Sequence, residues 1–180
     1  LRRDCQLQVI ESLLNANQLD LTAVAFDKRG DEETPLIRAI ALQRDDIVEL
    51  FLQRGADPHA LTPRDGRSAL RVACTVGNER IVQLLLERRV DLHAVGRQGF
   101  QPLTRAVEAN HAVVCKMLLE AGADPNFVNP RTGQRPLCAA LQRHRSRDVV
   151  RTLLEHGADV HDMGSTESPI MWACRAGTRE

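Results

Sequence analysis

Aromatic side chains are scarce in this chain of 180 residues: they make up 3% of the sequence, and tyrosine is absent. A hydrophobic core must therefore be built from leucine, valine, isoleucine and alanine, which suits closely packed helices. Hydrophobic residues still account for 43% of the chain and charged residues for 27%, a composition that supports a folded core. This length fits one ordinary domain or one short array of repeats.

The chain also lacks net charge, because 24 basic residues balance 24 acidic ones. Nothing therefore draws the whole molecule to nucleic acid or to an anionic membrane. We expect no membrane partner. Nucleic-acid binding through the arginine-rich stretch from Arg131 to Arg151 is a weaker alternative, because zero net charge and few aromatics count against it.

The five cysteines are far apart and form no CxxC pair, which argues against a disulfide framework or a zinc site. Their pattern suits a reducing compartment, so we expect an intracellular protein of the cytoplasm or nucleus. No apolar run approaches the roughly 20 residues that span a bilayer. The chain has no initiator methionine and no signal-peptide pattern, and we expect it to be part of a longer protein.

A short motif recurs along the chain at steps of 34, 33, 34 and 33 residues. An alanine follows five residues after the start of each copy. The copies are Thr34-Pro35-Leu36, Ser68-Ala69-Leu70, Gln101-Pro102-Leu103, Arg135-Pro136-Leu137 and Ser168-Pro169-Ile170, with Ala39, Ala73, Ala106, Ala140 and Ala173. Such a fixed period indicates a repeat architecture.

A second motif keeps the same step and follows an apolar run in each unit. Its copies are Gly55-Ala56-Asp57, Arg89-Val90-Asp91, Gly122-Ala123-Asp124 and Gly157-Ala158-Asp159. The stretch from Val9 to Ala23 resembles the second half of such a unit, with Asp20 in the aspartate place.

One unit reads as two short helices and a loop. Thr34, Ser68 and Ser168 can cap a helix start, and a proline often follows at the first helical position. A second helix with apolar spacing ends at a left-handed glycine such as Gly55. Arg89 stands in that glycine place, where a left-handed non-glycine residue costs about 1 kcal/mol. An extended loop then leads to the next unit.

Two helices and a protruding loop at this period resemble the ankyrin repeat. The resemblance implies an all-α solenoid of stacked helix–turn–helix units with protruding loops or β-turns. The family's usual histidine after Thr-Pro-Leu is replaced here by Ile37, Arg71, Thr104, Cys138 and Met171. The chain is therefore identified as a divergent member of the family.

The repeat pattern divides the chain into six segments. We expect a partial or capping repeat over residues 1–26, full repeats over 27–60, 61–94, 95–127 and 128–162, and a truncated repeat with its first helix only over 163–180. The fourth full unit carries one extra residue near His144-Arg145-Ser146, which should lengthen the turn between its helices.

Little in the sequence points to catalysis. No GxSxG, HExxH or phosphate-binding glycine loop is present. His59, His93 and His161 recur two residues after the repeat aspartate, but a solenoid spaces successive units apart, which argues against a metal site. Each repeat aspartate can instead accept hydrogen bonds from loop amides. We therefore predict a protein that is not an enzyme and needs no cofactor or metal.

Cys74 and Cys174 share one repeat place, and we interpret them as small core residues rather than nucleophiles. Trp172, the only tryptophan, lies in the last unit, where we expect it to pack in the core.

Function is expected at the surface, through binding of another protein by a monomeric chain. In ankyrin repeats the partner usually lies along the loop tips and first helices, on the concave face. The residues expected to contact it are Arg64, Arg67, Arg97, Phe100, Arg131, Gln134 and Arg143. Only Asp65 and Glu108 oppose these arginines, so an acidic segment with Phe100 as an apolar anchor is one hypothesis. The other hypothesis is that these exposed arginines are simply solvated, because arginine is common throughout the chain.

Two further alternatives stay open. The chain could be the substrate-recruiting or regulatory part of a larger enzyme, a ubiquitin-ligase adaptor or a bacterial effector. Asn126 has a spacing similar to that of ankyrin asparagines oxidised by the cytosolic asparaginyl hydroxylase. Hydrogen bonding of Asn126 within its own turn is the favoured interpretation.

Overall fold

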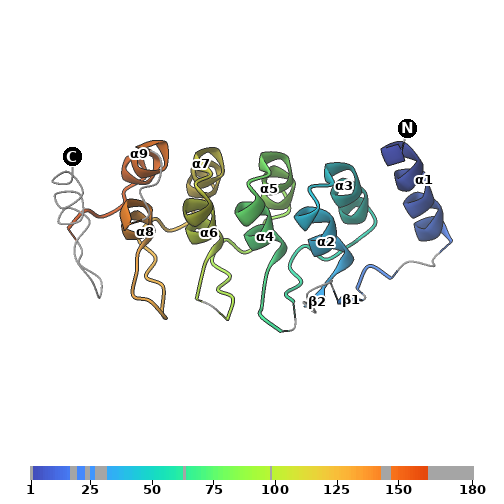
Figure 1. Ribbon diagram of the computed structural model, residues 1–180, viewed down its shortest axis with the longest axis horizontal. Coiled ribbons are helices and arrows are strands. Elements are labelled where there is room, and N and C mark those ends of the chain that lie inside the picture. Colours follow the sequence, from blue (N-terminus) through green and yellow to red (C-terminus); the bar gives the residue numbers. More distant parts are fainter. Residues whose placement is uncertain are drawn as a thin grey trace.

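The helices form a single curved stack of pairs, seen in a computed structural model (Figure 1). The structure describes residues 2–16, 20–22, 25–26, 32–62, 64–97, 99–142 and 147–161. In Figure 1 the even-numbered helices form one row, the odd-numbered helices form a second row above it, and the loops project below. The predicted all-α ankyrin-type solenoid is confirmed.

The helices described are short, apart from the first. They are α1 (Arg2–Asn15), α2 (Pro35–Ala41), α3 (Asp45–Gln53), α4 (Ala69–Val76), α5 (Glu79–Leu86), α6 (Pro102–Ala109), α7 (Ala112–Glu120), α8 (Pro136–Gln142) and α9 (Arg147–Glu155). Two-residue strands β1 (Ala25–Phe26) and β2 (Glu32–Glu33) pair antiparallel before α2, a ribbon that the repeat pattern did not predict.

The first helices of the four full repeats start where the sequence predicts. The hydroxyl of Thr34 accepts a hydrogen bond from the amide of Ile37 at 3.3 Å, and Ser68 does the same for Arg71 at 3.1 Å. Helices α2, α6 and α8 begin at a proline. Both caps therefore satisfy an amide that the helix itself leaves free.

The core is a set of columns that run through the stack. Ala39, Ala73, Ala106 and Ala140 are all buried, as are Leu36, Leu70, Leu103 and Leu137. These residues lie on α2, α4, α6 and α8, which pack in succession. Small alanines allow close approach of neighbouring helices, so each unit buries its apolar face against the next one.

Each loop leaves its second helix through the same hydrogen bond. The Oδ1 atoms of Asp57, Asp91, Asp124 and Asp159 each accept a bond at 2.8 Å from the backbone amide two residues later. Asp20 makes the same contact with Thr22. The predicted structural role of these aspartates is confirmed, and it holds in the partial unit at the N-terminal side as well.

Residues with a left-handed backbone lie at the ends of the second helices and at the ends of the loop tips. Gly55, Gly122 and Gly157 have φ of 88°, 99° and 85°, and Arg89 has φ of 53° in the equivalent place, as predicted. Gly66, Gly99 and Gly133 form a second set, each two residues before a helix N-cap place, with φ of 63°, 77° and 67°.

The loop tips differ in width. The amide of Gly66 donates to Thr62 and that of Gly133 to Asn129, four residues back, whereas Gly99 donates to Gly96, three residues back. The loops of the second and fourth full repeats therefore each have one more tip residue than the loop of the third.

Several predictions concern residues outside those described. They are the extra residue near 144–146, Arg143, and the whole truncated unit with Ser168, Trp172 and Cys174.

Candidate partner-binding surface

The predicted contact residues lie on three successive loops and the helices that follow them. Arg64, Arg97 and Arg131 are exposed, while Arg67, Phe100 and Gln134 are half-buried. Arg64, Arg97 and Arg131 each stand two residues before a left-handed glycine, and we call these three residues the arginine ladder. The structure thus gives the six described residues two different environments.

Arg67 belongs to the loop's own framework. Its Nε lies 2.8 Å from Oδ2 of Asp65, and the Thr62 hydroxyl donates to Oδ1 of the same carboxylate. Burial opposes ionisation of Asp65, but the Thr62 hydrogen bond and the charges of Arg67 and Arg71 outweigh it and hold the pKa of Asp65 below its usual value. The ionised carboxylate of Asp65 therefore stabilises this loop by binding both Arg67 and Thr62.

Arg71 occupies one of the places where the family has histidine, and it is 5% exposed. A Cβ on Gly96 would come within 2.6 Å of its Nη1 atom, so the guanidinium reaches the loop of the next unit. Burial and the neighbouring Arg105 lower the pKa of Arg71, while Asp65 and Glu108 oppose this. Sequence reasoning did not predict this inter-repeat role, because only the distance to Gly96 reveals it.

Phe100 is covered by a cation. The guanidinium carbon of Arg105 lies 4.0 Å from the centre of the Phe100 ring, and Arg105 also binds Glu108 at 2.9 Å. Arg38 and Glu33 occupy the equivalent places in the first unit and form an ion pair at 3.2 Å. The same pair of positions thus joins loop to helix by a cation–π contact in one unit and a salt bridge in another.

Neighbouring loops are joined by hydrogen bonds. The amide of Arg97 donates to the Asp65 carbonyl at 3.1 Å, and Nη1 of Arg131 donates to the Arg97 carbonyl at 2.8 Å. The three tips therefore form a connected row, in which Arg131 has a structural contact as well as an exposed side chain.

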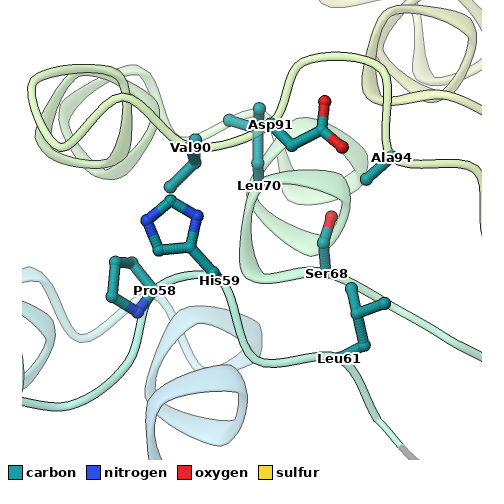
Figure 2. A pocket seen from close by; sticks show the side chains of 8 residues that line it. All are labelled: Pro58, His59, Leu61, Ser68, Leu70, Val90, Asp91 and Ala94. Carbon is teal, nitrogen blue, oxygen red and sulfur yellow. The ribbon is translucent and has the colours of Figure 1, made fainter.

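A shallow hollow of about 210 Å³ lies between the loops of the first two full units (Figure 2). Pro58 and His59 line one side, with the His59 ring turned toward Val90, and Leu61, Ser68 and Ala94 line the other. Leu70 and Asp91 complete the lining. The lining is mostly apolar, with His59, Ser68 and Asp91 as its polar side chains.

The side chain of Asn126 bridges two repeats, while its backbone amide bonds to Asp124 within its own turn. Its Nδ2 donates to the Gly157 carbonyl at 2.9 Å, and its Oδ1 accepts from the Asp159 amide at 2.7 Å. Arg135 also donates to the Asn126 carbonyl at 2.7 Å. The interpretation of a local turn contact was wrong for the side chain because the partner lies in the next loop, more than 30 residues away in sequence.

Among the described residues, three cysteine side chains lie in the core. Cys74, Cys115 and Cys138 are buried, which confirms the core role of Cys74, and burial raises the pKa of Cys115 to about 12. Within the described residues no three His, Cys, Asp or Glu side chains are grouped to hold a metal ion. Among the same residues, no helix is long and apolar enough to cross a bilayer.

A family model described as ankyrin repeats (3 copies) matches residues 36–129 and, in a second match, residues 114–180. These matches extend over more than half of the chain. The chain belongs to the ankyrin-repeat family. The matched residues include the hydrogen-bonded aspartates of the four full repeats and the left-handed glycines described above.

Curated ankyrin relatives share about a third of their aligned residues with the chain. The mouse B-cell lymphoma 3 protein homolog is 35% identical over 133 residues, which cover 72% of this chain and 29% of the relative. The chicken nuclear factor NF-kappa-B p105 subunit is 31% identical over 133 residues, covering 71% and 13%. Mouse ankyrin repeat and SOCS box protein 16 is 35% identical over 119 residues, covering 62% and 26%. The chain thus spans less than a third of the length of each of these relatives.

Proposed function

We propose that this ankyrin array is a non-catalytic module that binds an acidic segment of a partner protein through its loop tips and first helices. The observation that carries the proposal is the arginine ladder, which places one exposed guanidinium at the same position of three successive loops. Arginine forms planar, two-pronged contacts with carboxylates and is common in protein interfaces.

The charge balance around the ladder supports an acidic partner. Asp65 is paired with Arg67 and Glu108 with Arg105, so the two carboxylates of this face are already neutralised within the array. The ladder gathers three of the positive charges on one surface of a chain whose formal net charge is zero. Such a local excess attracts anionic groups at short range even when the whole molecule is neutral.

The test is a charge reversal with a matched control. A partner is first captured with the full chain, and its affinity is then measured for the triple variant Arg64→Glu, Arg97→Glu and Arg131→Glu. The control reverses three exposed arginines of the odd-numbered helices and has the same net charge: Arg80→Glu, Arg147→Glu and Arg151→Glu. We expect the ladder variant to lose affinity by about tenfold or more, with little loss in the control. Equal affinities of the two variants would refute binding through the ladder.

A second candidate is a recruiting or regulatory part of a larger protein. It is favoured by the chain's coverage of only 13–29% of the relatives described above. One further relative is named NF-kappa-B inhibitor delta, from mouse, which is 35% identical over 111 residues and covers 61% of this chain. Both candidates predict protein binding, and expression of the full-length protein with and without this array would separate them.

A further inference from the structure

The arginine ladder has one member per loop, at the same backbone position of each loop. Each arginine precedes a left-handed glycine by two residues, so the three Cα atoms repeat with the units. The loops are also tied to one another by the Arg97–Asp65 and Arg131–Arg97 hydrogen bonds. The ladder is therefore a row of cations with one step per repeat.

Helix packing sets the length of that step. Helices α4, α6 and α8 pack in succession through the buried alanines Ala73, Ala106 and Ala140. Axes of packed helices lie about 8–10 Å apart, the lower values being reached with small side chains at the contact. We take this distance as the offset between the Cα atoms of successive ladder arginines.

A polyproline II segment matches this step. Its rise of about 3.1 Å per residue and three residues per turn place every third side chain on one face, about 9.3 Å apart. In a β-strand the same-face spacing is about 6.8 Å, which loses register with the ladder after one step. An α-helix rises about 1.5 Å per residue, so its carboxylates would have to recur about every seventh residue.

The apolar surface of the loops also favours a slender partner. Exposed Leu61, Val95 and Val128 occur once per loop, each four residues after a repeat aspartate. A partner helix binds best in a continuous apolar groove. Single apolar contacts at each repeat step instead suit an extended segment that places one side chain against each loop.

We infer that the arginine ladder recognises an extended, polyproline II-type protein segment with a carboxylate at every third residue. The inference rests on the proposed function and specifies the register of its partner. Each carboxylate accepts hydrogen bonds from one guanidinium, and the residues between carboxylates contact the loops.

The experiment compares model peptides of equal length and equal charge. Each labelled peptide carries three glutamates, separated by one, two or three prolines, with flanking prolines to match the lengths. A fourth peptide is helical with glutamate at every seventh residue, and a fifth replaces the glutamates of the two-proline peptide with glutamine. Binding to the full chain is measured by fluorescence anisotropy at low and at physiological salt.

We expect the two-proline peptide to bind about fivefold or more tightly than its one- and three-proline counterparts, because a mismatch separates at least two charged pairs. This preference should vanish in the Arg64/Arg97/Arg131→Glu variant and persist in the Arg80/Arg147/Arg151→Glu control. The glutamine peptide should bind most weakly.

The other outcomes separate the two claims. Equal affinity for the three proline spacings would overturn the register while leaving arginine-dependent binding of acidic segments, and hence the proposed function, intact. Tightest binding of the helical peptide would overturn the extended conformation. Absence of binding by every peptide would also overturn this inference, and the proposed function would then be judged by the captured partner alone.

Discussion

The side-chain oxygen of Asn126 accepts a hydrogen bond from the backbone amide of Asp159 at 2.7 Å, across the boundary between two repeats. The side-chain nitrogen Nδ2 of Asn126 donates to the Gly157 carbonyl at 2.9 Å. In the equivalent place of the other units stand His59, His93 and His161. A primary amide offers a donor and an acceptor together, so one side chain satisfies two backbone groups of the neighbouring loop.

Removal of this bridge should weaken the coupling between the third and fourth full repeats. We expect Asn126→Ala to lower the free energy of unfolding by about 1–2 kcal/mol, because two partly exposed hydrogen bonds are lost. Urea unfolding followed by circular dichroism measures the effect. The control is Asn126→His, which installs the residue of the other units and should retain part of the stability. An unchanged midpoint in Asn126→Ala would show that water replaces both bonds.

The turn of the second full repeat depends on a glycine beneath a histidine. Gly77 has φ of 82°, and a Cβ there would clash with the ring of His111. The equivalent residues Gln43 and Asn110 also have positive φ, so this backbone place accepts a side chain elsewhere in the array. Crowding by His111 is therefore what restricts position 77.

We expect Gly77→Ala to destabilise the chain by about 1 kcal/mol more than Gly55→Ala. Gly55 also has a positive φ, of 88°, but a Cβ added there would meet nothing within 4 Å. Adding His111→Ala to Gly77→Ala should recover most of that difference, which a double-mutant cycle on thermal unfolding measures. Additive effects of the two substitutions would contradict a direct clash.

The charge of Asp65 should make the stability of the array depend on pH. Its pKa is lower in the folded chain than in the unfolded chain. The stabilisation is therefore fully present above the unfolded value, about 3.9, and is lost as the pH falls through the lower folded value. Asp65→Asn keeps an acceptor for Thr62 but removes the charge that faces Arg67 and Arg71.

At pH 7 we expect Asp65→Asn to lower the free energy of unfolding by about 1 kcal/mol. This difference between the variant and the unchanged chain should shrink below about pH 4. Unfolding midpoints at pH 7, 5 and 3 test this, with Asp57→Asn as a control for a more exposed repeat aspartate. A gap that stays constant over this range would show that the charge of Asp65 contributes nothing.

The buried thiols should resist modification until the array opens. Burial raises the pKa of Cys74 well above its usual value and that of Cys115 to about 12, so neither forms appreciable thiolate at neutral pH. We expect alkylation of both to proceed at the rate of local or global opening, at least about 100-fold slower than in urea. Mass spectrometry of peptides resolves each site, and rapid labelling of Cys115 in the folded chain would contradict its burial.

Local features of the fold could be predicted from the sequence because their partners are near in the chain. The Thr34 and Ser68 caps and the aspartate contacts each join residues two or three apart. Contacts between repeats could not be predicted in the same way. The reach of Arg71 to the next loop and of Arg131 to the Arg97 carbonyl depends on the distance between loops, which a period of 33 or 34 residues does not specify.

The candidate surface, too, could be predicted only in part from the sequence. The sequence included Arg64, Arg97 and Arg131 among the expected contact residues, because the repeat alignment superposes them. It did not separate those arginines from Arg67, whose carboxylate partner Asp65 lies two residues away, or reveal the cation over Phe100. Side-chain pairing within a loop depends on rotamers, and a one-dimensional pattern carries no information on them.

Each loop leaves by an aspartate that binds its own backbone and returns by a left-handed glycine, and both anchors are local. The tips between them already differ in width, with Gly66 and Gly133 closing wider turns than Gly99. Residues can therefore be inserted, deleted or exchanged at a loop tip without a change in the packing of the helices. The surface offered to a partner can thus change at a loop tip while the helix packing stays the same, so long as the hydrogen bonds between neighbouring loops are kept or replaced.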